Sequence, residues 1–236
     1  MKPIFLFILT VYCSFCFSQV QSLTGIGVLQ IGKTTSEIFT SLKIDSADVI
    51  DGSAESVEQF RQSVKNHIVK VHYNSSSTLM KEIASINTQD CTYDDYPDSK
   101  IEKCDLIIQY FIPRYEWNGI VLAHFILTFH ANILVEIYES STENQVDSRI
   151  LYYLTDNYKD YSQLSDNPDY DPDAKCIPTP WELYRWDNGT PVRGSWYSGG
   201  HCCNNASVGV QEFYIANKDY LDNLSTRCST NSGGAH

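Results

Sequence analysis

Three histidines and two adjacent cysteines are the residues of this sequence best suited to catalysis. His201 directly precedes Cys202 and Cys203, and His124 and His130 lie six residues apart in an apolar segment. A thiolate beside a histidine base is a nucleophile, and the same side chains are zinc ligands. One interpretation is therefore a thiol- or metal-dependent hydrolase around His201, Cys202 and Cys203. The other is exposed strand histidines beside disulfide-bonded cysteines.

Other patterns that resemble cofactor or metal sites fail at a defining position. Residues 25–30 begin like a dinucleotide-binding loop, but Gln30 replaces the third glycine. Alternate aspartates within 169–173 are spaced like calcium ligands, but Ala174 occupies the position that requires glycine. The sequence therefore predicts no cofactor, no metal and no catalytic residue, and it favours a binding or structural protein over an enzyme.

Aromatic residues gather on two predicted strands, 181–186 and 192–197. Tyr184, Trp186 and Trp196 are the candidate binding residues, because on an exposed face they would form a flat platform for sugar rings or for a protein. Strand tryptophans more often belong to the core, where they bury a large apolar area. We therefore expect a scaffold that binds a protein partner, with a carbohydrate-binding module as the alternative.

The N-terminal segment predicts where the protein works. Its apolar run, residues 4–17, is shorter than the roughly 18 to 20 residues that a helix needs to span a bilayer. Small residues at Cys16 and Ser18 suit a cleavage site, so residues 1–18 are predicted to be a signal peptide and Gln19 the mature N-terminus. We expect a secreted or periplasmic protein with no membrane span after cleavage.

The cysteines outside the signal peptide are even in number, which in an exported chain predicts disulfides. Proximity in the sequence favours a disulfide between Cys91 and Cys104. Cys176 and Cys228 would then each pair with one of the two adjacent cysteines, although sequence alone allows every pairing. No Cys-x-x-Cys pair supports a zinc site. The disulfide candidates are Cys91, Cys104, Cys176, Cys202, Cys203 and Cys228.

The charge balance excludes one class of partner. The chain has 17 Lys and Arg against 29 Asp and Glu, a formal net charge of −12. Such a surface repels nucleic acid and anionic lipid, whose binding requires a basic face. The expected partner is a protein or a glycan.

The elements that must position these residues begin with helices. Thr34 and Glu37 form a capping box at the start of a helix, and apolar residues recur at helical spacing within 57–64. A strand is expected at 68–73 and a short helix at 79–86.

Antiparallel strands are the strongest structural signal. Apolar segments at 106–115, 120–129 and 133–138 are separated by turn residues and predict a meander. The alternation within its second strand predicts that Phe125, Leu127 and Phe129 are buried.

The remaining elements follow the meander. Ser140 and Glu143 form a second capping box, which predicts a helix directly after Ser140. Three further strands are predicted at 181–186, 192–197 and 207–215, followed by a last helix at 218–224.

The predicted fold class is α+β, an antiparallel β-meander with helices packed on one face and reinforced by disulfides. Residues 1–18 are the signal peptide and 19–165 an α+β domain. Residues 166–180 are an acidic, proline-rich loop or linker, and 181–236 a β-rich part packed on the same domain.

Residues 27–42, Gly-Val-Leu-Gln-Ile-Gly-Lys-Thr-Thr-Ser-Glu-Ile-Phe-Thr-Ser-Leu, resemble the opening of a known family. Their order of strand, glycine and capped helix is similar to that of small outer-membrane lipoprotein A or BamE-like envelope proteins. The resemblance implies an exported, non-catalytic envelope protein. This chain differs from the family in lacking the cysteine that carries the lipid.

Overall fold

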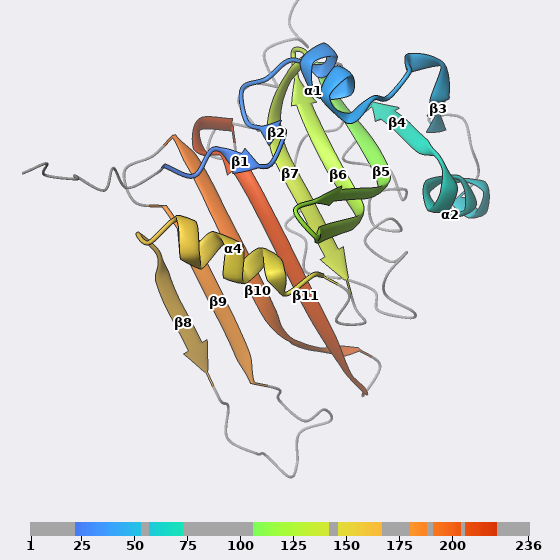
Figure 1. The fold of residues 1–236 in the computed structure, drawn as a ribbon. Coiled ribbons are helices and arrows are strands. Elements are labelled where there is room, and N and C mark those ends of the chain that lie inside the picture. The colour runs from blue at the N-terminus through green and yellow to red at the C-terminus, as the bar shows by residue number, and fades with distance from the viewer. Residues whose placement is uncertain are drawn as a thin grey trace, which may run out of the picture.

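The computed structural model describes residues 22–52, 57–72, 106–141, 146–166, 180–187, 191–203 and 206–220. Within these residues, nine strands form one sheet in the order β3-β4-β5-β6-β7-β11-β10-β9-β8 (Figure 1). Neighbouring strands are antiparallel except for the β3–β4 pair. The predicted α+β class is confirmed. The strands are β3 Val49–Asp51, β4 Ile68–His72, β5 Ile107–Trp117, β6 Ile120–His130, β7 Ile133–Ser141, β8 Ser162–Asp166, β9 Trp181–Trp186, β10 Val192–Cys203 and β11 Ala206–Asn217.

The meander β5–β6–β7 lies at the middle of the sheet, with Tyr110, Leu127 and Ile137 side by side across its three strands. Phe125, Leu127 and Phe129 are buried, as their alternation predicts. Continuous apolar runs favour this position because strands covered on both faces are apolar at nearly every residue.

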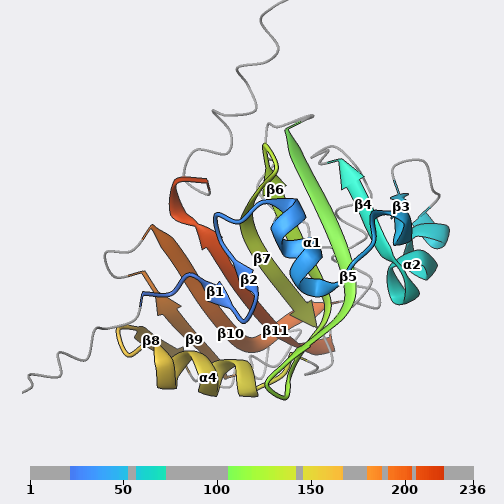
Figure 2. The same cartoon turned by 45° about the horizontal axis from the view of Figure 1, so that its top comes forward.

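One face of the sheet carries α1, Thr35–Leu42, and α4, Arg149–Asn157. The predicted capping box of α1 is present: the Glu37 N–H donates to Thr34 Oγ1 at 3.3 Å, and the Thr34 N–H donates to Glu37 Oε2 at 2.8 Å. Figure 2 shows α1, α4 and the β1–β2 ribbon on this same face. Ile38 of α1 enters the main core.

A two-stranded ribbon precedes α1. It consists of β1, Gly25–Ile26, and β2, Leu29–Gln30, joined by a turn in which Gly27 has a φ of 58°. A Cβ at Gly27 would approach the Trp117 ring to 2.7 Å, so both the turn and the packing require glycine here.

The opposite face carries α2, Val57–Asn66. Phe60 packs edge to face on Phe111 with ring centroids 5.2 Å apart, and both belong to a second cluster that includes Val64 and Ile126. The prediction that the helices share one face is therefore wrong for α2. Its physical reason is that β5 and β6 carry apolar residues on both faces.

The helix predicted directly after Ser140 begins later. Ser140 lies opposite Glu212 of β11, so strand pairing extends β7 to Ser141, and α4 begins at Arg149. Ile150 and Leu154 of α4 are buried against the sheet. Long-range pairing here overrides a local capping pattern.

Several predictions fall outside the described residues. They include the signal peptide, the helix at 79–86, most of the acidic loop and four of the six disulfide candidates, Cys91, Cys104, Cys176 and Cys228. Cys202 and Cys203 are the last two residues of β10, where they pair with Ser207 and Ala206 of β11. No described helix has the length and apolarity needed to cross a membrane.

Candidate functional site

The three aromatic candidates lie together on the α4 face of the sheet. Tyr184 stands opposite Trp196, with ring centroids 5.9 Å apart, and stacks along β9 on Trp186 at 6.4 Å. The Tyr161 ring completes the group at 5.7 Å from both Tyr184 and Trp186. The sequence therefore identified residues that the fold brings together.

Burial decides what this aromatic group can do. Trp186 and Trp196 are only 3% and 4% exposed, and Trp186 Nε1 donates to the Tyr158 carbonyl at 2.9 Å beneath α4. Tyr184 is half-buried, and its hydroxyl accepts a hydrogen bond from Gln163 Nε2. The tryptophans thus form part of the core wall, which leaves Tyr184 alone of the three in contact with solvent.

The histidine candidates are not brought together. His124 is exposed on β6, with a φ of 54°, and the His130 ring lies 6.0 Å from that of Tyr220. His201 is on β10, which β7 and β11 separate from β6. Among the described residues, no group of three His, Cys, Asp or Glu could hold a metal ion.

The backbone of β6 changes its pattern at His124. Leu122 and Phe125 both enter the main core, although regular alternation would place them on opposite faces. Pairing with β7 starts only at Ile126, so among the described strands β5 alone pairs with the first half of β6.

Two carboxylates replace the missing strand beside this half of β6. The Val121 N–H donates to Asp147 Oδ2 at 2.9 Å, and the Ala123 N–H donates to Glu139 Oε1 at 3.0 Å. Buried backbone donors need such partners, so both acidic side chains have a structural role at the gap between β6 and β7.

Glu139 is the more unusual of the two acids. The residue is 1% exposed, and its Oε2 is buried without a hydrogen-bond partner in the described structure. Desolvation raises the pKa of Glu139 to about 8, while the Ala123 N–H lowers it and the charge of Asp147 raises it. The carboxyl is therefore mainly protonated at neutral pH and can donate or accept a proton.

Asp147 remains ionised beside it. Desolvation raises the pKa of Asp147, but hydrogen bonds from the Arg149 side chain and from backbone N–H groups outweigh that effect and lower it. The Arg149 guanidinium donates to this carboxylate from Nη2 at 2.6 Å and from Nε at 2.8 Å. The pKa values of the two acids are thus shifted in opposite directions, because among the described residues only Asp147 has a cationic partner.

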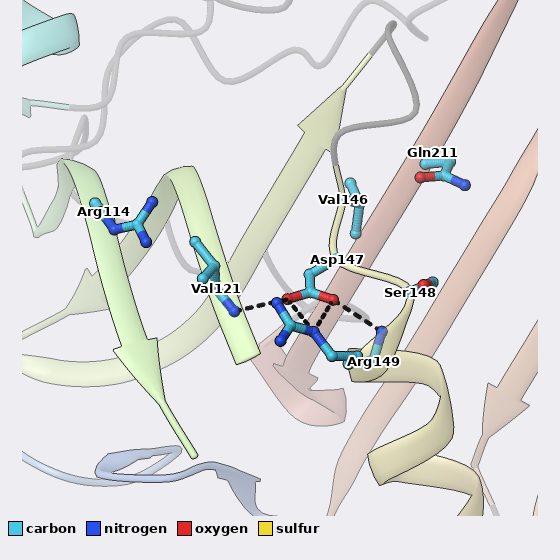
Figure 3. Close-up of a pocket in the computed structure, with 7 residues that line it drawn as sticks. All are labelled: Arg114, Val121, Val146, Asp147, Ser148, Arg149 and Gln211. Carbon is cyan, nitrogen blue, oxygen red and sulfur yellow. Dashed lines mark hydrogen bonds and ion pairs between the residues drawn. The ribbon is translucent and has the colours of Figure 1, made fainter. Parts of the chain in front are cut away.

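A hollow of about 540 Å³ opens next to Asp147 (Figure 3). The described residues of its wall supply two guanidinium groups and the Gln211 amide but no thiol or imidazole. They could therefore bind a small polar group without supplying a nucleophile of that kind. The wall consists of Arg114, Val121, Val146, Asp147, Ser148, Arg149 and Gln211.

A different kind of site lies at the edge strand β8. Among the described strands, β8 is joined by hydrogen bonds only to β9, and all five of its residues are exposed. Leu164 at its centre is 48% exposed, and Tyr152 on α4 is 66% exposed. Sequence reasoning missed β8 because Ser-Gln-Leu-Ser-Asp contains one apolar residue and shows no alternation.

No family model matches this chain, and neither a curated protein nor a solved structure matches it.

Proposed function

We propose that this chain is an exported, non-catalytic binding protein whose partner is another protein. One contrast carries the proposal: Trp186 and Trp196 are buried, whereas Leu164 and Tyr152 project into solvent. A carbohydrate-binding module needs exposed rings on which sugars stack, and exposed apolar side chains beside a strand edge suit a polypeptide.

A direct comparison of ligand classes tests this proposal. The oxidised mature chain would be screened against a phage-displayed library of random peptides and against a glycan array. We expect enrichment of peptides and no retained glycan. Because Trp186 and Trp196 are buried, the glycans should leave the intrinsic tryptophan emission unchanged. Glycan binding that shifts the tryptophan emission would contradict the protein partner and favour the carbohydrate alternative at Tyr184, Trp186 and Trp196.

Export to an oxidising compartment is part of the same proposal. It is supported by the signal-like segment 1–18, by the six cysteines that follow it and by the similarity of 27–42 to envelope proteins. Disulfides would then reinforce the fold. Thiol titration of the denatured, unreduced chain should find no free thiol.

The enzyme alternative has its own signature in that titration. A hydrolase around His201, Cys202 and Cys203 requires either a free thiol or a bound metal. Two free thiols, or zinc in stoichiometric amount in the native protein, would replace the binding proposal with the hydrolase.

A further inference from the structure

Strand β8 has the properties of a docking strand. It ends the nine-stranded sheet, as Figure 1 shows, and presents one row of backbone N–H and C=O groups away from β9. Its pairing with β9 runs in unbroken register from Ser162 opposite Arg185 to Asp166 opposite Trp181. A regular edge of this kind is a template for one more strand.

Several usual protections of a sheet edge are absent from the residues of β8 itself. Its residues include no proline, no lysine and no bulge, and its only charge is Asp166 at the end. By contrast β3, at the other edge, has only three residues, Val49–Asp51. Short edge strands resist strand addition, so the two edges differ in their capacity to bind.

Apolar and aromatic side chains flank β8 on both faces. Leu164 stands opposite half-buried Leu183 on the face away from α4. On the α4 face Gln163 stands opposite Tyr184, with Tyr161 beside it. An added strand would therefore find an apolar contact for alternate side chains on one face and tyrosine rings on the other.

Charge selects among the possible occupants. Asp166 and Glu182 are exposed at one end of the β8–β9 pair, and Asp156 and Asp160 are exposed in the segment before β8. Two described cations lie nearby: Lys159, paired with Asp156 at 3.7 Å, and Arg185. The chain as a whole has a net charge of −12, so a second copy is repelled and a basic segment is attracted.

We propose that β8 binds an extended, basic segment of a partner protein, which pairs with it as a tenth strand. Alternate apolar side chains of that segment pack on Leu164 and Leu183, and its basic side chains face the acids around β8. This inference rests on the proposed function, because it takes the partner to be a protein, and it adds where and how that protein binds.

The probe is a capped heptapeptide of alternating lysine and valine, titrated into the full mature chain by calorimetry. Two companion peptides separate the causes: one has glutamate in place of lysine, and the other is N-methylated at consecutive residues so that neither backbone edge can donate. We expect saturable binding of the basic peptide and binding at least about tenfold weaker for both companions.

Two leucine variants locate the site. Leu164→Lys and Leu106→Lys change the charge equally, and Leu106, 41% exposed just before β5, lies away from the sheet edge. Leu164→Lys should lower the affinity for the basic peptide by about tenfold or more, and Leu106→Lys should lower it by less than about twofold. Circular dichroism checks that both variants fold.

Several results would overturn the inference. If the two variants weaken binding of the basic peptide equally, the peptide is attracted by charge without pairing to β8. The same conclusion follows if the N-methylated peptide binds as tightly as the unmodified one. Sedimentation that finds a dimer abolished by Leu164→Lys would assign the edge to a second copy. Peptides selected from the library whose binding ignores Leu164→Lys would leave the protein-binding function intact and move its site elsewhere.

Discussion

The central strands β5–β7 and the outer strand β8 belong to one sheet but have opposite surroundings. Ile126 and Leu127 are adjacent in β6 and both buried, because α2 covers one face and the main core covers the other. In β8 every residue is exposed. The comparison teaches that the central strands hold the core together, whereas the edge strand β8 contributes little to it, which is why the proposed partner is placed there.

The largest expected effect tests the centre. Phe125→Ala should lower the free energy of unfolding by about 3 to 5 kcal/mol, because the Phe125 ring is fully buried and its removal leaves a cavity. Urea unfolding measures this loss, and Phe129→Ala should behave alike. Losses below about 1 kcal/mol for both variants would contradict the assignment of this face to the core.

The second effect concerns the gap beside β6. The folded-state pKa of Glu139, about 8, lies above its ordinary value of 4.5, so its contribution to stability is full below about pH 4.5 and is lost as the pH rises through 8. Each pKa unit corresponds to about 1.4 kcal/mol, which makes the total a few kcal/mol at most.

Glu139→Gln isolates this contribution. Gln keeps an oxygen for the Ala123 N–H and cannot ionise, so the variant should lose most of the fall in stability between about pH 5 and about pH 8. Asp147 has the opposite effect on the pH dependence of stability. Because its pKa is lowered in the folded state, its contribution to stability is lost as the pH falls. Unfolding curves for the parent and the Gln variant with the same pH slope would show that Glu139 is not the titrating group.

The sequence predicted the centre of the molecule better than its edge. Thr34 and Glu37 lie three residues apart, so the cap of α1 depends on neighbouring residues that the sequence shows directly. The apolar runs of β5 and β6 suit only buried strands. The start of α4 was misplaced because Glu212, some seventy residues along the chain, pairs with Ser140 and extends β7. No local pattern contains that information.

The candidate sites were predicted in part for the same reason. Tyr184, Trp186 and Trp196 are close because two neighbouring strands carry them, but their burial depends on α4, which the sequence placed too early. Glu139 and Asp147 become neighbours only because β6 separates from β7. A buried acid of this kind has no sequence signature.

A smaller effect concerns the helix that covers the central strands. Thr34→Ala removes the hydroxyl that caps α1 and should cost about 1 kcal/mol in the free energy of unfolding. Thr40→Ala is the matched control, since Thr40 is exposed within the same helix and its side chain makes no cap. Equal losses for the two threonines would mean that the cap does not stabilise α1 in the folded chain.

The smallest expected effect tests the edge. Leu164→Lys should change the free energy of unfolding by less than about 0.5 kcal/mol, because the Leu164 side chain is already half in solvent and a lysine there can extend outward. Leu183→Lys, one strand further in, should cost more, since Leu183 is half-buried between β8 and β10. Thermal unfolding of the two variants measures this gradient. A loss at Leu164 as large as that at Leu183 would mean that β8 is as much a part of the stable sheet as β9, and that an edge strand free to accept a partner is the wrong description of it.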